Sequence, residues 1–429
     1  MRVTATPHNV ASEMALAIYA KVLDGVRSDA LVHQAMQRVG DALFIQGRHI
    51  DLSHYDRVWI AGSGKASTDM ARAASEVLGD RLSGGVIVTK AGSGSPITGI
   101  EVIEASHPVP DVSSLFAGSR LLEFAAELNE KDLVLFLLSG GSSALIESPR
   151  DTISLDDLQK TNQVLLSSNV DITAMNAVRS RLSRIKAGGL ARAFEPATVI
   201  ALILSDVVGN DLQTIGSGPL ISPKANTTPM PEWLFPFLPT SVQALLEVSL
   251  PPKPLTVPVE HYVVGGISLA ILAAVKAAME LDLKPFPYAD PLKGEARTMS
   301  AKICTLMKKW PLDNGCLIFG GETTVKIKGK GLGGRCQEMA VAAARTVSEM
   351  PDVCFLACGT DGSDGPTDAT GGIVDPGSIA RAKQAGFHRS RSLADNDSYH
   401  FLEASGGLVL TGPTGSNVND LVLVVHATD

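Results

Sequence analysis

Cysteine is scarce in this 429-residue sequence, and long apolar runs and clusters of basic residues are missing altogether. The five cysteines are odd in number and none belongs to a CxxC pair; they are Cys304, Cys316, Cys336, Cys354 and Cys358. This pattern argues against a disulfide framework or a zinc site. It favours a reducing cytoplasm, with the cysteines as small core residues.

The missing runs and clusters exclude further classes of protein. No apolar segment approaches the roughly 20 residues that a membrane-spanning helix needs, and the N-terminus lacks the pattern of a signal peptide. The net charge is −8 without a basic stripe, so nucleic-acid binding is not expected. What is present is apolar material: 45% of the residues are hydrophobic, enough for the cores of two or three domains.

One pattern recurs six times along the chain. A short apolar run ends in Gly, Ser, Asp or Thr, and a helical stretch follows; the runs are VWIAGSGK, LVLFLLSGGSS, TVIALILSDVVGN, YVVGGISLA, CLIFGGETT and VCFLACGTDGSDG. Continuous apolar runs between helices are typical of parallel strands buried on both faces. The expected fold class is therefore α/β with open sheets. The first fifty residues are expected to be helical, from apolar positions spaced by three and four.

A proline-rich stretch between residues 222 and 258 indicates a domain boundary, with a short helix near Ser241–Val248. We expect domains at 1–245 and 246–429. In the second domain, TTVKIKGKGLGG alternates like an exposed strand and residues 406–426 read as a hairpin, so its sheet should be mixed.

The loop GSGK at residues 62–65 follows the first apolar run and opens a helix. A Walker A loop is excluded because Trp59 stands where its first glycine belongs and Ala66 follows the lysine. A dinucleotide fingerprint is excluded because Ser67 replaces its third glycine. A glycine-rich turn at a helix N-terminus with Lys65 beside it suits an anion. An ordinary surface lysine is the alternative.

Two more loops of the first half carry polar residues. SGGSSA, beginning at Ser139, is not a nucleophile elbow because Ala144 replaces the last glycine of GxSxG. It suits a second anion-binding turn or a plain tight turn. Asp206 and Asp211 follow the next run and suit a hard cation, a substrate hydroxyl or helix capping. His107 is a candidate for substrate contact, with simple packing as the alternative.

The second half offers an arginine and a set of acidic residues. Arg335 opens an alanine-rich helix at the end of a glycine loop, where a bidentate contact with phosphate or carboxylate is favourable. Asp361 and Asp364 lie in a loop that resembles an EF-hand, but Gly372 replaces its final glutamate, so calcium is not expected. Both aspartates stay candidates for Mg²⁺ or a general base.

Together these motifs resemble the class II glycerate 2-kinases, the MOFRL-domain family, some members of which carry the older label hydroxypyruvate reductase from tartrate utilisation. The matching stretches span about residue 60 to 424: AGSGKAS, SHPVPD, LLSGGSSAL, MNAVRSRLSRIKAGGLA, LSDVVGNDLQTIGSGP, GGETTVKIKGKGLGGR, CGTDGSDGPTDATGG and NDSYHFLEASGGLVLTGPTGSNVNDL. The order of the motifs makes the resemblance specific.

The resemblance implies ATP-dependent phosphorylation of D-glycerate at its 2-hydroxyl, giving 2-phospho-D-glycerate and ADP, with Mg²⁺ as cofactor. It implies two three-layer α/β/α domains with the active site in a cleft between them. The first would hold a parallel, Rossmann-like sheet and the second a mixed one. Its partners would be small molecules, with no nucleic acid and no membrane, and a homodimer is a candidate assembly.

The resemblance also assigns roles to residues. Lys65 and Arg335 become the leading catalytic cations, with Asp206 as a third catalytic residue. The expected ligands of Mg²⁺ are drawn from Asp206, Asp211, Asp361 and Asp364. The expected contacts with substrate or nucleotide are Gly62, Ser63, Gly64, His107, Ser139, Gly140, Gly141, Ser142, Ser143, Arg179, Lys186, Glu322, Gln337 and Thr360. Within this set, Arg179 and Lys186 would hold the glycerate carboxylate from one helix, unless they form a solvated face.

The sequence departs from the family pattern at several places around the expected cleft. Asn210 replaces an aspartate, Gly265-Gly266-Ile267 lacks an expected asparagine, and Cys336 replaces an asparagine. Ser142 and Ala187 each replace a glycine. These departures keep two other hypotheses open: a kinase for another small hydroxy acid, and an acid sensor without turnover. A hydroxypyruvate reductase using NAD(P)H is the remaining alternative, and the absence of GxGxxG argues against it.

Overall fold

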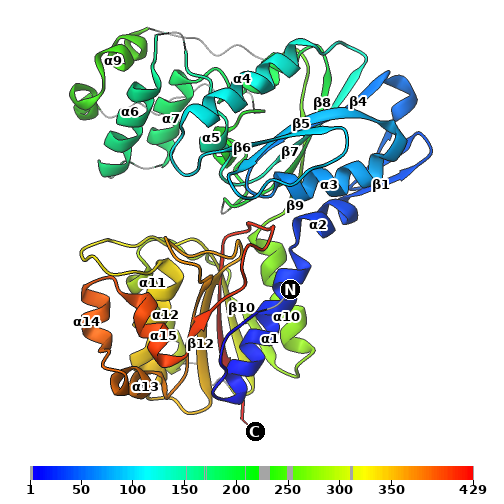
Figure 1. Cartoon of the computed structure of the whole chain (residues 1–429). Coiled ribbons are helices and arrows are strands. Elements are labelled where there is room, and N and C mark those ends of the chain that lie inside the picture. The colour runs from blue at the N-terminus through cyan, green and yellow to red at the C-terminus, as the bar shows by residue number, and fades with distance from the viewer. Residues whose placement is uncertain are drawn as a thin grey trace. The chain divides into compact units, whose positions relative to one another are not determined.

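The computed structural model describes residues 3–150, 152–168, 170, 172–207, 209–221, 232–248, 255–309 and 313–428. The chain forms two compact units (Figure 1): unit 1 combines Met1–Arg27 with Gly265–Asp429, and unit 2 is Ser28–Val264. This division differs from the expected one at residue 245. The chain passes into unit 1 at Gly265, and the N-terminal helix belongs to unit 1 because its apolar residues pack there.

Unit 2 is built around a six-stranded sheet with the order β6-β5-β4-β7-β8-β9. Its strands are β4 (Arg57–Ser63), β5 (Leu82–Lys90), β6 (Ile100–Ala105), β7 (Asp132–Leu138), β8 (Thr198–Leu204) and β9 (Glu260–Gly265). The pairs β5–β6, β4–β5, β4–β7 and β7–β8 are parallel, as predicted. Strand β7 is buried along its whole length, which its unbroken apolar sequence requires. Strand β9 was expected in the second domain but completes this sheet.

Helices cover both faces of this sheet (Figure 1). Helix α3 (Ser67–Leu78) contacts β4, β5 and β7, while α4 (Val112–Ala126) contacts β5 and β6 and packs against α8 (Gly189–Phe194). Helices α6 (Leu155–Ser167), α7 (Ile172–Leu182) and α9 (Thr240–Glu247) share a separate core of leucines and valines. Helix α9 confirms the helix predicted near Ser241–Val248.

The first fifty residues were expected to be helical, and this expectation is wrong beyond residue 35. After α1 (Val10–Gly25) and α2 (Ser28–Ala35), the chain forms a three-stranded antiparallel sheet. Its strands are β1 (Met36–Val39), β2 (Ala42–Ile45) and β3 (Arg48–Asp51). Gly40 and Gly47 adopt φ values of 59° and 84° at the two turns. These glycines permit the left-handed turns that join the three strands.

Unit 1 contains a mixed six-stranded sheet, as predicted, with the order β10-β11-β15-β12-β13-β14. Its strands are β10 (Lys284–Pro287), β11 (Gly315–Gly321), β12 (Val353–Gly359), β13 (Gly371–Val374), β14 (Leu408–Val409) and β15 (Asp420–His426). Strand β10 runs parallel to β11, and β15 is antiparallel to both β11 and β12. The expected C-terminal hairpin is wrong, because β14 pairs with β13. The TTVKIKGKGLGG segment forms no strand.

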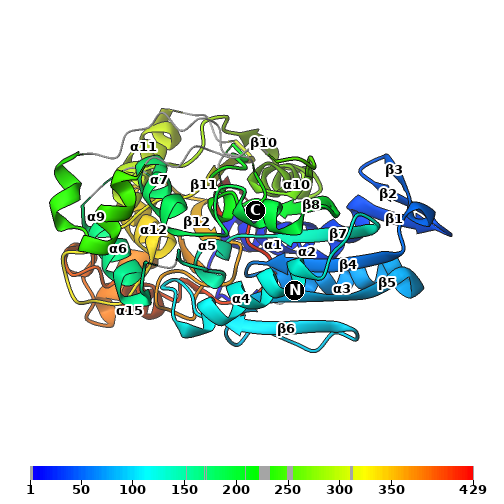
Figure 2. The same ribbon diagram turned by 90° about the horizontal axis from the view of Figure 1, so that it is seen from above.

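Two groups of helices cover the sheet of unit 1 (Figures 1 and 2). Helices α1 and α10 (Ile267–Met279) pack together against one face. The other face is covered by α11 (Ala296–Lys309), α12 (Arg335–Val347), α13 (Ser378–Gln384), α14 (Arg389–Ala394) and α15 (Ser398–Ser405). All five cysteines are free and buried in this unit, which confirms their predicted role as core residues.

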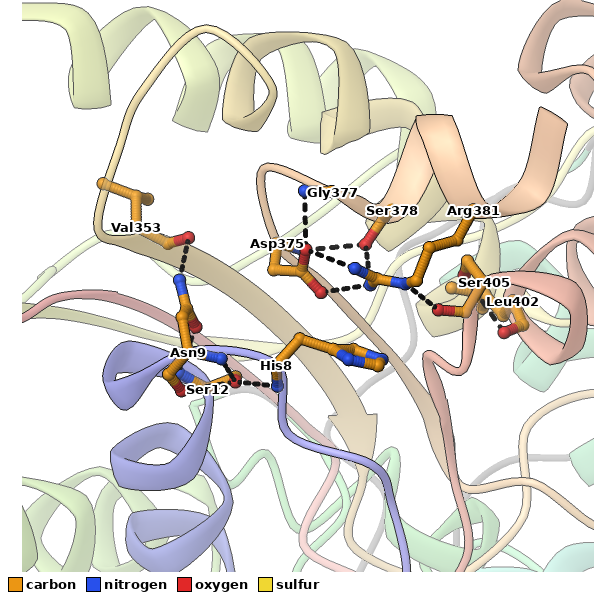
Figure 3. A network of polar contacts seen from close by, with 10 residues as sticks. All are labelled: His8, Asn9, Ser12, Val353, Asp375, Gly377, Ser378, Arg381, Leu402 and Ser405. Carbon is orange, nitrogen blue, oxygen red and sulfur yellow. Dashed lines mark hydrogen bonds and ion pairs between the residues drawn. The ribbon is translucent and has the colours of Figure 1, made fainter. Parts of the chain in front are cut away.

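The N-terminal segment is fastened to unit 1 by hydrogen bonds (Figure 3). Asn9 caps α1 through Ser12 and donates from Nδ2 to the Val353 carbonyl at 3.4 Å. Nearby, Arg381 holds Asp375 and donates from Nε to the Ser405 carbonyl at 2.7 Å. The contact of Asn9 with Val353 joins segments that lie far apart in the sequence and is one reason why the first helix belongs to unit 1. None of the described helices is long and apolar enough to cross a membrane.

Candidate functional site

The predicted loops of unit 2 meet at one edge of its sheet because three parallel strands end side by side there. In the strand register Ser63 pairs with Leu138, and Leu138 pairs with Ile203. The loops after β4, β7 and β8 therefore emerge together. This edge is where open α/β sheets bind ligands.

The Lys65 loop and the SGGSS loop interlock through their backbones. The Lys65 N–H donates to the Gly140 carbonyl at 2.9 Å, and the Ala66 N–H donates to Ser139 Oγ at 3.0 Å. Gly64 has a φ of 140°, and a Cβ atom there would lie 2.0 Å from Ser139 Oγ. Only glycine fits at this contact. The turn before Lys65 is therefore fixed by the neighbouring loop rather than by its own sequence.

Gly141 brings three of the predicted residues together. It adopts a φ of 88°, and a Cβ atom on it would lie 3.1 Å from His107 Cδ2 and 3.3 Å from Lys65 Cγ. A lysine, an imidazole and a glycine turn thus surround one point at the edge of the sheet. Gly62 and Ser63 are the last two residues of β4 and are buried. They therefore fix the point at which the loop leaves the sheet.

Helix α5 (Ser142–Leu145) follows the glycine turn and is held by the loop after β8. The Ser143 and Ser217 hydroxyls are 2.8 Å apart, and Ser217 Oγ donates to Asn176 Oδ1 at 3.2 Å. Asp206 lies in the same loop, two residues after β8 ends at Leu204. The Asp211 carboxylate accepts from the Gln213 N–H and, at 2.7 Å, from the Thr214 hydroxyl. Asp211 therefore serves as a turn cap in this structure.

A cavity of about 190 Å³ lies beside these loops. Gly141, Ser143 and His107 line it together with Arg179 from α7. Arg179 donates from Nε to Asn162 Oδ1 at 2.7 Å, and burial lowers the pKa of its guanidinium. No described carboxylate forms an ion pair with it. Arg179 is thus a half-buried, oriented cation, and its bond to Asn162 argues against the alternative of a solvated helix face.

Lys186 also lines the cavity, but its surroundings differ from the expectation. It lies beyond the end of α7, and its Nζ donates to Glu147 Oε2 with both side chains buried. Lys186 is therefore already paired, and Arg179 alone remains suited to a carboxylate. Glu147 was missed from the sequence because it matches no short motif. The nearby Ala187 and Asn210 both have left-handed backbones, with φ of 48° and 54°.

In unit 1 the predicted residues gather around the start of β15. Because β15 runs antiparallel to its neighbours, its first residue, Asp420, pairs with both Gly321 at the end of β11 and Gly359 at the end of β12. Arg335 donates to Asp420 from Nε at 2.6 Å and from a terminal nitrogen at 2.8 Å. No role was predicted for Asp420, although it lies in a motif of the resemblance.

Arg335 is held in place by acidic neighbours. Besides Asp420, the Glu322 carboxylate lies 3.3 Å from it. Burial disfavours the charged guanidinium, yet Asp420, Cys336 and Glu322 together raise the pKa of Arg335. Asn419 Nδ2 in turn donates to Glu322 Oε2 at 3.3 Å. The arginine is therefore permanently charged and oriented by a bidentate partner.

Asp364 and two more predicted residues, Gln337 and Thr360, hold the backbone around the start of α12 and β15. The Asp364 carboxylate accepts from the backbone N–H groups of Cys336 and Gln337, at 3.2 Å and 2.8 Å. Gln337 Nε2 donates to Thr367 Oγ1 at 2.8 Å, while its buried Oε1 has no partner among the described atoms. The Thr360 hydroxyl donates to the Asn419 carbonyl. These contacts fix the Arg335 helix relative to β15.

Asp364 should make the stability of the protein depend on pH. Burial and the nearby Asp420 raise the pKa of Asp364 to about 7, against the two N–H groups that lower it. Such a carboxyl has a higher pKa in the folded chain than in the unfolded chain. It stabilises the folded chain at pH values below its unfolded-state pKa, and this stabilisation is lost as the pH rises through its folded-state pKa. We expect the stability of the wild type, relative to Asp364→Asn, to fall between about pH 4 and about pH 7 by up to about 1.4 kcal/mol per pKa unit.

Denaturation midpoints of both proteins across this pH range measure the effect. A difference between wild type and Asp364→Asn that stays constant with pH would contradict the assignment. Glu403→Gln, at an exposed glutamate of the same unit, is the matched control.

Both open sheets carry glycine turns at the carboxyl ends of their strands, with a lysine in one unit and an arginine in the other. These features define a class of α/β enzymes that act on anionic substrates. Residues 14–234 match the model described as "Domain of unknown function (DUF4147)", and residues 315–420 match the MOFRL family. The chain is 39% identical over 422 residues to the D-glycerate 2-kinase of Thermotoga maritima, covering 96% of this chain and 97% of that protein. A glycerate 2-kinase from Pyrococcus horikoshii is 35% identical over 435 residues, covering 96% and 97%.

The structural comparison agrees with these relatives. A crystal structure of a glycerate kinase from Thermotoga maritima matches with a TM-score of 0.83 at 38% identity, covering 97% of this chain and 99% of that one. The chain belongs to the glycerate 2-kinase family that combines the DUF4147 and MOFRL domains.

Proposed function

We propose that the protein transfers the γ-phosphoryl group of ATP to the 2-hydroxyl of D-glycerate, giving 2-phospho-D-glycerate and ADP. The observation that carries this proposal is the cavity of unit 2. It is lined by a half-buried arginine suited to a carboxylate and by Gly141, on which a Cβ atom would lie 3.3 Å from Lys65 Cγ, so the lysine and the glycine turn suited to phosphate lie beside it. Its volume of about 190 Å³ suits an acid of three carbons. The similarity to D-glycerate 2-kinases supports the same reaction.

In this proposal the acid binds through Arg179. The planar guanidinium, already oriented by Asn162, receives the glycerate carboxylate as a charge-assisted pair. The 2-hydroxyl then points along the cavity toward Gly141, His107 and Lys65. His107 borders the cavity and would contact the acid.

The hydroxyl oxygen attacks the γ-phosphorus, the bond from that phosphorus to the ADP oxygen breaks, and the hydroxyl proton leaves. Asp206, two residues beyond the end of β8, is proposed as its acceptor. Phosphoryl transfer needs positioning and charge neutralisation more than covalent help. Lys65 and Arg335 are proposed as the two cations of this step. The backbone N–H groups of the glycine turn and the first turn of α5 would contact phosphate; the residues are Gly140, Gly141, Ser142 and Ser143.

Mg²⁺ belongs to the proposal, and the acidic residues fit it unequally. Among the described residues no group of three or more His, Cys, Asp or Glu side chains could hold a metal by itself. Mg²⁺ with a nucleotide needs only one or two carboxylates besides phosphate oxygens and water. Asp361 suits this role, because its carboxylate and that of Asp420 both lie near Gly359, whose Cβ would be 3.4 Å and 3.5 Å from them. When bound, Mg²⁺ would neutralise charge on the phosphates.

Asp211 and Asp364 suit a metal less well. Both oxygens of each carboxylate accept hydrogen bonds from the chain itself. Asp206, which the resemblance also offers as a ligand of Mg²⁺, is assigned in this proposal to the proton instead. Cys336, one of the departures from the family pattern, is fully buried, and burial raises the pKa of its thiol. It therefore packs beneath the Arg335 loop.

The proposed reaction is tested by ADP release from a mixture of protein, ATP, Mg²⁺ and D-glycerate. We expect ADP to form only when all components are present. Oxidation of NADH by hydroxypyruvate at a rate above the kinase reaction would instead support the reductase alternative. Glycerate binding without ADP release would support the acid sensor.

Replacing Arg179 by Gln should raise the KM for D-glycerate about 10- to 100-fold, because a charge-assisted pair is worth about 1.5–3 kcal/mol. The carboxylate is bound equally in the ground state and the transition state, so kcat should change far less. Steady-state kinetics measure both constants. Lys160→Gln, at an exposed position of α6, is the control. A variant with normal KM and low kcat would contradict the role of Arg179.

A further inference from the structure

The acid cavity of unit 2 holds a charged pair that the proposed reaction does not use. Arg179 and Lys186 bring two positive charges to its lining, and Glu147 brings one negative charge. The Lys186 Nζ donates directly to Glu147 Oε2, and both side chains are almost completely buried. Glu147 therefore cancels the charge of Lys186. With His107 neutral, the lining keeps a single net positive charge.

Glu147 is poorly placed to act as a base. Its Oε2 is occupied by Lys186, and its Oε1 accepts from the Ser148 N–H at 3.0 Å. The chain backbone also fixes it tightly, because a Cβ atom on Gly118 would lie 2.1 Å from the Glu147 carbonyl oxygen. The carboxylate thus stays in one place and contributes a fixed negative charge to the cavity.

Thr161 adds a buried polar group without a partner to the lining of the cavity. It lines the cavity and is 1% exposed, yet its hydroxyl has no hydrogen-bond partner among the described atoms. A buried polar group without a partner costs about 1–3 kcal/mol. A ligand with a hydroxyl or carboxylate group would remove this cost.

We propose that Glu147 is the specificity residue that makes this cavity select monocarboxylates over dicarboxylates. The inference rests on the proposed function, because it takes the cavity as the acid-binding site of the kinase. D-glycerate carries one negative charge, which matches the single net charge of the lining. Tartronate is the same three-carbon 2-hydroxy acid with a second carboxylate in place of the hydroxymethyl group. Its second negative charge would face Glu147 where water screens charges poorly.

The test compares the dissociation constants of D-glycerate and tartronate, measured by calorimetry at about pH 8, where an ordinary imidazole is neutral. For the wild type we expect tartronate to bind at least about tenfold more weakly than D-glycerate. Glu147→Gln keeps the shape of the side chain and raises the net charge of the lining by one. The ratio of the two constants should then shift at least about tenfold in favour of tartronate. A merely structural role would weaken both acids alike and leave the ratio unchanged.

Lys186→Gln tests the same idea from the opposite side, so the result does not depend on one variant folding. It lowers the net charge by one and should shift the ratio against tartronate. The double variant Glu147→Gln/Lys186→Gln restores the original net charge and should restore the wild-type ratio. Glu123→Gln, at an exposed residue of α4, is the control and should change nothing.

Two outcomes separate this inference from the proposed function. A ratio that stays within about twofold of wild type in both single variants, with D-glycerate still bound, would overturn the role of Glu147 alone. A wild type that does not bind D-glycerate at all would overturn the assignment of the cavity, and with it the proposed function.

Discussion

Replacing Lys65 by Ala is expected to lower kcat by about 10³-fold or more, the loss typical of removing a cation from a phosphoryl-transfer site. The KM for D-glycerate should change little, because Arg179 and not Lys65 is assigned to the acid. The geometry supports a specific effect on the chemical step. The Lys65 backbone is fixed by Gly140, and its side chain passes Gly141 at the edge of the sheet. Steady-state measurement of ADP release gives both constants.

The control for this variant is Lys131→Ala. Lys131 is exposed and directly precedes β7, so it lies at the amino ends of the parallel strands, whereas Lys65 follows their carboxyl ends. Its replacement should leave kcat within about twofold. A Lys65→Ala protein that turns over at close to the wild-type rate would remove Lys65 from the mechanism.

Replacing Arg335 by Ala should lower kcat by a comparable factor and should also destabilise unit 1. Asp420 is buried, and its bidentate partner would be lost. Removing one partner of a buried ion pair costs about 3–5 kcal/mol. Denaturation and kinetics must therefore be measured on the same preparations. Arg345→Ala, at an exposed position of the same helix, should change neither quantity by much.

A second substitution separates the catalytic role of Arg335 from its structural role. Adding Asp420→Asn to Arg335→Ala neutralises the orphaned carboxylate and should recover much of the lost stability. We expect kcat to stay low in this double variant. Recovery of turnover together with stability would mean that Arg335 only holds Asp420.

The strands were the most predictable part of the fold. All six apolar runs form strands, and five of them are buried over most of their length, as expected for runs inside an α/β layer. The expected C-terminal hairpin failed for a different reason. Val409 and Leu421 lie on strands that pair with distant partners, and local alternation carries no information about which strand lies alongside. The N-terminal helix joined unit 1 through contacts such as that of Asn9 with Val353, which no local pattern encodes.

The candidate site was predictable where a loop follows a strand and much less so elsewhere. Lys65, Gly141 and His107 were expected from their loops, and the strand register brings them together. Glu147 and Asp420 were missed because each acts by pairing with a residue far away in the sequence. Asp364 was expected as a ligand of Mg²⁺ or a general base. In the structure its carboxylate caps a helix, since a carboxylate after a strand suits both roles, and its role toward a metal stays a prediction.

The position of the transferred phosphate tests the central claim most directly. Wild-type protein would be incubated with ATP, Mg²⁺ and D-glycerate, and the product examined by phosphorus and proton NMR alongside a measurement of ADP. We predict a single phosphate ester at C2, formed in equal amount to ADP. A phosphate at C3, or no ester despite intact protein, would contradict the account.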